Sequence, residues 1–155
     1  MKQYNYKKTG KSLLIDLPMA YELPRKTIKD KRVSLSLNSF RKKHPRETSE
    51  VKKLVEKAVS PQIPEGFYFE NPVVVDFILV KKDLRIYDSS NWFAQGAKLL
   101  YDCLQDIGVL LGDDDEYIYD QHIHKSVLVR RRLSGIFIFS EVEPVKQIED
   151  EEFQY

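Results

Sequence analysis

The residues best suited to chemistry lie between positions 86 and 118, where carboxylates, an amide and a lysine recur around one helical stretch. Asp88 and Asn91 stand near its start, and three consecutive aspartates follow its end, namely Asp113, Asp114 and Asp115. A carboxylate at a strand's end and another in the turn after the next helix can be brought together at one sheet edge. Oxygen ligands of this kind suit a hard cation such as Mg²⁺ or Mn²⁺. The pattern therefore predicts a carboxylate metal site.

The elements that must position these residues follow from periodicity. Residues 91–107 place apolar side chains at helical spacing, Ser89 or Ser90 can cap the start, and Gly108 is a typical helix stop. Residues 73–81 are a β-branched run and predict a buried strand. Residues 117–129 and 136–142 read as two more strands, which a short polar link would join into an antiparallel hairpin.

The first half of the chain is less regular. Residues 11–17 predict a short strand, residues 33–37 alternate like a strand or extended arm, and residues 47–59 have helical periodicity. Residues 18–32 lack a period and predict a basic loop. This order predicts one α+β domain over residues 1–143, a mixed sheet with two main helices packed on one face. Residues 144–155 predict an acidic, flexible tail.

Charge is unevenly distributed along the 155 residues, although the formal net charge is only +1. Residues 1–53 carry 15 basic and 5 acidic side chains, whereas residues 100–155 carry 5 basic and 13 acidic ones. Such asymmetry indicates a polyanion partner or an acidic functional cluster. The strongest polyanion signal comes from nine basic residues: Arg25, Lys26, Lys29, Lys31, Arg32, Arg41, Lys42, Lys43 and Arg46.

Composition narrows the class of protein further. No apolar run approaches the roughly 20 residues of a membrane span, so no membrane partner is expected. The single cysteine, Cys103, cannot form an internal disulfide, which favours a reduced, cytoplasmic setting. The chain is long enough, and with 42% hydrophobic residues apolar enough, to fill one core.

The stretch from 84 to 120 resembles the RusA-type Holliday-junction resolvases, small endodeoxyribonucleases of phages and bacteria. Their motif is an Asp-x-Asp-Asn run opening a helix, a Lys followed four residues later by an Asp, a Gly, and an Asp-Asp turn before a strand. The matching positions here are Asp88, Asn91, Lys98, Asp102, Gly108 and the pair Asp113 and Asp114. Ser90 stands where the family usually has its second Asp.

The resemblance implies a homodimer that resolves four-way junctions or other branched DNA in recombination and repair. In that family a divalent metal activates water against a phosphodiester, so Asp88 and Asp114 would be the principal Mg²⁺ ligands, with Mn²⁺ as a substitute. Asp113 would also bind metal, and Lys98 would face the phosphate. Supporting positions would be Ser90, Asn91, Asp102 and Asp115.

Other interpretations of the same residues stay open. Because Ser90 is a neutral, weaker ligand than Asp, the chain can instead be a branched-DNA-binding protein with little or no nuclease activity. The basic half can also face an acidic protein or the chain's own acidic tail. Lys98 and Asp102 have the spacing of a simple helix ion pair, and His122 and His124 are expected to be ordinary polar positions on a strand. Asp76 can be a core carboxylate or approach Asp88, and residues 130–132 can add basic contacts.

Overall fold

The computed structural model describes residues 6–26, 31–36, 45–85 and 87–144. Four strands form the main sheet: β1 (Tyr6–Pro18), β4 (Val73–Lys81), β5 (Ile118–Val129) and β6 (Ser134–Pro144). A second, two-stranded sheet consists of β2 (Ala20–Leu23) and β3 (Lys31–Ser34). The helices are α2 (Pro45–Val59), the short 3₁₀ helix η1 (Ser60–Gln62) and α3 (Ser89–Ile107).

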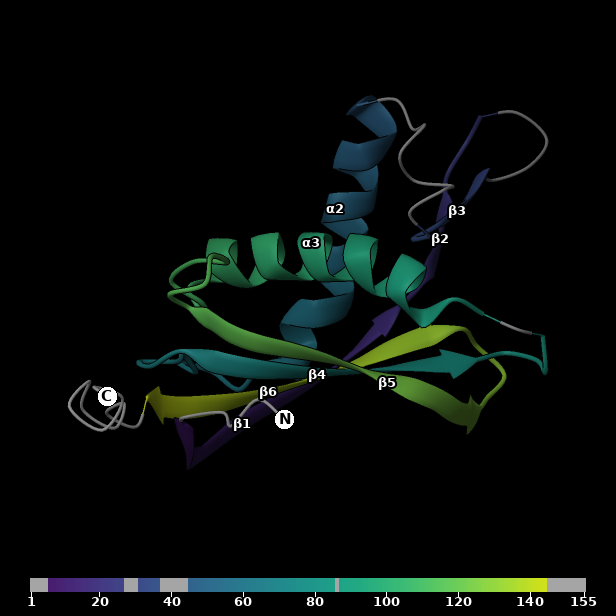
Figure 1. The fold of residues 1–155 in the computed structure, drawn as a ribbon. Coiled ribbons are helices and arrows are strands. Elements are labelled where there is room, and N and C mark those ends of the chain that lie inside the picture. The colour runs from purple at the N-terminus through teal and green to yellow at the C-terminus, as the bar shows by residue number, and fades with distance from the viewer. Residues whose placement is uncertain (1–5, 27–30, 37–44, 86, 145–155) are drawn as a thin grey trace.

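The strand order in the main sheet is β1–β6–β4–β5. The sheet is mixed, because β4 pairs antiparallel with β6 and parallel with β5. Helix α3 makes the crossover between the parallel pair, and both main helices lie over the same face of the sheet (Figure 1). The predicted mixed sheet with two helices on one face is therefore confirmed, as one compact domain.

The predicted hairpin between the last two strands is wrong. Strand β4 lies between β5 and β6, and β6 pairs with β4 and β1. The link at 130–133 passes over the end of β4, and the Arg130 amide donates to the Lys81 carbonyl at 2.8 Å. Strand β4 is buried along most of its length: Val73, Val75, Phe77 and Leu79 belong to the main core, and Val74 and Val80 are buried as well.

The structure also departs from the prediction in the basic segment, residues 18–32. Residues 18–32 were expected to be a loop, whereas residues 20–23 form β2, which pairs antiparallel with β3. The side chains of Tyr21, Leu23 and Val33 are buried in the core. Alternation over four residues is too short to stand out among charged neighbours, so the strand is visible only from its packing.

Met19 joins the two sheets at a crowded point. Its amide donates to the Leu133 carbonyl at 3.2 Å, and its carbonyl accepts from the Leu35 amide at 2.8 Å. Its side chain fills the space that two glycines leave open: a Cβ at Gly135 would lie 2.2 Å from Met19 Cε, and one at Gly96 would lie 2.9 Å away. Both glycines are therefore needed for close packing of α3, β6 and the β1–β2 link.

The two edges of the main sheet differ. At the β1 edge the Gln62 side chain accepts from the Asp16 amide and donates to the Asp16 carbonyl, both at 2.8 Å. At the β5 edge, no strand among the described residues pairs with the outer side of this 12-residue strand. Unpaired long edge strands offer a template for another chain.

None of the helices in the described ranges is long and apolar enough to cross a membrane.

Candidate functional site

Asp88 is the N-cap of α3, a role that the sequence had suggested for Ser89 or Ser90. One of its carboxylate oxygens, Oδ1, accepts hydrogen bonds from the amides of Ser90 at 3.1 Å and Asn91 at 3.4 Å. Its backbone is extended, as the residue before a helix requires. The side chain is exposed, so its second oxygen can reach a ligand.

The acidic turn, Asp113 to Asp115, leads into β5 and is also locally ordered. The Asp114 carboxylate accepts from the Glu116 amide at 2.9 Å, and the Asp114 carbonyl accepts from the amides of Tyr117 and Ile118. Tyr117 packs against Gly112, where a Cβ would lie 2.4 Å from the ring. All three aspartates are exposed. The hydrogen bonds of the turn therefore leave all three aspartate side chains exposed.

The structure places Asp88 and the acidic turn at opposite ends of α3, so the expectation that they share one sheet edge is wrong. A helix rises about 1.5 Å per residue, so the 19 residues of α3 span roughly 28 Å. Asp88 follows the end of β4, whereas the acidic turn precedes Ile118, which is in register with Val73 at the start of β4 (Figure 1). Within the described residues of one chain, no three His, Cys, Asp or Glu side chains converge on a possible metal position.

Lys98 and Asp102 lie on α3 between these two ends. Lys98 is exposed and is ten residues, or about 15 Å along the helix axis, from Asp88. Asp102 pairs with Lys52 of α2 at 4.0 Å. This contact, and not a pair with Lys98, is the ion pair that the structure gives Asp102. Lys98 is thus available to a ligand on the outer surface of α3.

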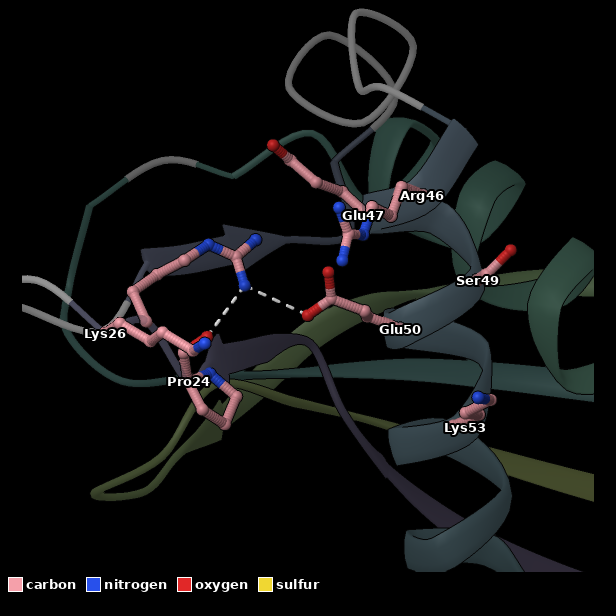
Figure 2. A pocket seen from close by; sticks show the side chains of 8 residues that line it. Pro24, Lys26, Arg46, Glu47, Ser49, Glu50 and Lys53 are labelled. Atoms are coloured by element: carbon pink, nitrogen blue, oxygen red, sulfur yellow. Dashed lines mark hydrogen bonds and ion pairs between the residues drawn. The ribbon is translucent and has the colours of Figure 1, made fainter.

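A basic cleft of about 660 Å³ opens between the end of β2 and the first turns of α2. We call it the α2 cleft. Figure 2 shows its side chains, of which four are cationic and two are anionic: Pro24, Arg25, Lys26, Arg46, Glu47, Ser49, Glu50 and Lys53. The Arg25 guanidinium donates to the Pro24 carbonyl at 2.8 Å and to Glu50 Oε2 at 3.0 Å. The cleft therefore keeps a net positive charge around a partly neutralised arginine.

The other basic residues that the sequence predicts to bind a polyanion do not all lie in the α2 cleft. Lys31 pairs with Glu47 at 2.6 Å, so its charge is partly offset. Arg32 lies on the other side of the β2–β3 sheet and lines a second cleft together with residues near 131. Lys29, Arg41, Lys42 and Lys43 lie outside the described residues. The structure therefore brings together three of the nine predicted cations, Arg25, Lys26 and Arg46, in the α2 cleft.

The loop between β4 and α3 contains an ordered group that the sequence did not reveal. Arg85 donates to Asp83 at 2.9 Å and to the Tyr87 hydroxyl at 3.1 Å, and that hydroxyl donates to Asp83 at 3.1 Å. The hydrogen bond from Arg85 is the main cause that lowers the pKa of Asp83 to about 2. This group holds the loop immediately before Asp88. The only sequence signal was alternate spacing of Asp83, Arg85 and Tyr87.

The strand histidines contact carboxylates on the face of the sheet that the helices leave open. His124 Nε2 lies 2.7 Å from Asp76 Oδ1, and His122 Nε2 lies 3.6 Å from Asp120 Oδ2. Asp76 is therefore a partner of His124 on this face, and its contact is not with Asp88. The predicted role of the histidines as polar strand positions agrees with this arrangement.

Comparisons with known proteins do not assign a family: no protein-family model matches the chain, and no curated protein sequence matches it.

Proposed function

We propose that this chain is a Mg²⁺-dependent endodeoxyribonuclease that acts on branched DNA as a two-fold dimer. The observation that carries the proposal is the position of Asp88 and the acidic turn at the two ends of α3, next to the edge strand β5, whose outer side has no partner among the described strands. The motif that resembles RusA-type resolvases supplies the reaction class. The α2 cleft supplies a surface for DNA phosphates.

The α2 cleft suits a nucleic-acid backbone because Lys and Arg bind phosphates with release of counterions. Lys26 and Lys53 form no ion pair with any described residue, so their ammonium groups are available for such contacts. Phosphate contacts position a duplex without reading its sequence. This property agrees with recognition of DNA shape at a junction.

The described residues of one protomer do not form the metal site that the proposal requires, because Asp88 and the acidic turn are separated by the length of α3. We therefore assign no step of cleavage to a single protomer. A carboxylate site needs Asp88 of one protomer beside the acidic turn of the other. An isologous two-fold contact would form two such sites, which matches the two symmetric nicks that junction resolution requires.

The β5 edge is the surface best suited to this contact. Neither β1 nor β5 has a strand partner on its outer side among the described residues, but at the β1 edge Gln62 already occupies both main-chain groups of Asp16. Ile123 and Val129 on β5 are 41% and 50% exposed, respectively, so apolar side chains are available for a contact at this edge. A second copy is the occupant that we assign to this edge.

Antiparallel pairing of two β5 strands about an axis perpendicular to the sheet would also align the two α3 helices antiparallel. The start of each helix would then lie at the same end of the joined sheet as the partner's acidic turn. This arrangement brings Asp88 toward the partner's Asp114, with Asp113 and Asp115 beside it. Lys98 would lie on the outer surface between the two sites.

The proposal is tested by incubation of the full chain with a labelled four-way junction, a fork and a linear duplex, with Mg²⁺, with Mn²⁺ and with EDTA. We expect metal-dependent nicks in the branched substrates and few in the duplex. Substitution of Lys26 and Lys53 by Gln should weaken junction binding, whereas substitution of Lys7 and Lys8 by Gln is the charge-matched control. Equal cutting of all substrates, or none in either metal, contradicts the proposal.

A second candidate is a branched-DNA-binding protein that does not cleave. It is favoured by Ser90, which replaces a carboxylate of the motif, and by the structural roles of Asp88 as a helix cap and Asp114 as a turn residue. Salt-sensitive junction binding without nicks in either metal supports this candidate and excludes the first.

A further inference from the structure

A second basic cleft lies on the opposite side of the β2–β3 sheet from the α2 cleft. Its volume is about 410 Å³, and we call it the arginine cleft. Three segments that are distant in sequence line it: β2–β3, the residue after β4, and the β5–β6 link. The lining residues are Ala20, Glu22, Arg32, Lys82, Arg131, Arg132 and Leu133.

Main-chain hydrogen bonds hold these segments in place. The Met19 amide donates to the Leu133 carbonyl at 3.2 Å, which ties the start of β2 to the β5–β6 link. The Arg130 amide donates to the Lys81 carbonyl at 2.8 Å, which ties the same link to the end of β4. Leu133 is buried, so the floor of the cleft is part of the core. The cations are therefore brought together by the fold itself.

The charge of the arginine cleft is strongly one-sided. Four cations, Arg32, Lys82, Arg131 and Arg132, face one carboxylate, Glu22. All four are exposed, and among the described residues none of them forms an ion pair. Arg25 and Lys31, by contrast, are paired with glutamates. Like charges held close together without partners repel one another, and this cost is removed when an anion binds between them.

We propose that the arginine cleft binds backbone phosphates of the DNA strand. Guanidinium groups present planar, paired donors that match phosphate oxygens, and three of the four cations are arginines. The inference rests on the proposed function, since it takes its ligand from that activity, but it concerns residues outside the motif and outside the α2 cleft.

The position of the cleft gives it a specific task. Lys82 follows the end of β4, and Asp88 follows the same strand end six residues later, so both lie at the end of the sheet where α3 begins (Figure 1). The acidic turn of the same protomer lies at the opposite end. A strand held in the arginine cleft would therefore be positioned beside Asp88, while the α2 cleft holds DNA on the other side of the β2–β3 sheet.

The test is junction affinity of the full chain, measured by fluorescence anisotropy at several salt concentrations. Substitution of Arg131 and Arg132 by Gln should weaken binding about tenfold or more and make the slope of log K against log salt shallower by about one to two. The control with Gln at Lys7 and Lys8 has the same charge change at the other end of β6, where Lys7 is in register with Glu143. It should bind almost like the wild type.

Lys82→Gln is a second variant, in an exposed loop. It tests the arginine cleft independently if substitution of Arg131 and Arg132 prevents folding. A several-fold loss of affinity is expected. Wild-type affinity in both variants, with the junction still bound through the α2 cleft, overturns the arginine cleft alone. Absence of any junction binding by the wild type overturns the proposed function as well.

Discussion

Asp88 and Asp114 lie at opposite ends of the same crossover. Asp88 accepts hydrogen bonds from the first amides of α3, and Asp114 accepts one from the Glu116 amide in the turn before β5. Parallel strands joined by a helix place the helix start at one end of the sheet and its end at the other. Two motif residues that flank such a helix are therefore separated by its length in one chain. They can meet only between chains.

Asp88 has a structural role that is separable from any chemical one. Asp88→Ala removes the cap and should lower the free energy of unfolding by about 1 kcal/mol, whereas Asp88→Asn keeps a capping oxygen and should cost little. Both changes remove the carboxylate, so both should abolish metal-dependent nicking. Denaturant unfolding and junction cleavage, measured on the two variants, distinguish these roles. Equal stability of Ala and Asn variants would show that the cap contributes nothing.

The surroundings of Glu141 predict how the free energy of unfolding depends on pH. Glu141 is only 5% exposed, and although burial alone would raise its pKa, hydrogen bonds from the Thr9 hydroxyl and the Glu70 and Asn71 amides hold the pKa below its usual value. Its contribution is therefore present above the unfolded pKa and is lost as pH falls through the lower folded pKa.

Glu141→Gln should consequently lower the free energy of unfolding by about 1 to 3 kcal/mol at neutral pH and flatten its decline below pH 5. Glu143→Gln, two residues along the same strand and exposed, is the matched control and should change neither quantity. Denaturant titrations from about pH 3 to pH 7 measure both. An unchanged acid dependence in the Glu141 variant would mean that its hydrogen bonds do not favour the charged form.

The close packing around Gly135, where the two sheets meet, leaves no room for a larger side chain. Gly135→Ala would place a methyl group 2.2 Å from Met19 Cε and 2.6 Å from the Phe77 ring, so it should destabilise the fold by about 1 to 3 kcal/mol. In a double-mutant cycle with Met19→Ala, the two costs should be less than additive, because removal of the Met19 side chain makes room for the methyl group. Additive costs would show that Met19 is not the obstacle.

The sequence was sufficient for elements whose signal is local. Strand β4 has the predicted bounds, 73–81, because its apolar run, rich in β-branched residues, is interrupted only at Asp76 before Lys81 ends it. Helix α3 ends where Gly108 adopts a positive φ of 92°. The predicted N-cap, Ser89 or Ser90, is wrong, and Asp88 takes this role; Asp and Ser are comparable N-caps, so only the hydrogen bonds to Asp88 decide between them.

Long-range relationships were beyond the sequence. The placement of β4 between β5 and β6 depends on which strands bury most surface together, and no local pattern encodes it. The arginine cleft is only partly visible in the sequence, because residues 130–132 form a basic run but no local pattern associates Lys82 with them. The same non-local pairing separated Asp88 from Asp114, which sequence spacing had placed at one edge.

The most direct test of the shared site is a mixing experiment with Asp88→Asn and Asp114→Asn, each expected to be inactive alone. If each site combines Asp88 of one protomer with Asp114 of the other, a mixed dimer contains one site with both substitutions and one intact site. After unfolding and refolding together, the two inactive proteins should recover about a quarter of wild-type nicking, since half the dimers are mixed and each has one intact site. No recovery, with mixed dimers demonstrated by differential tagging, would contradict the shared site.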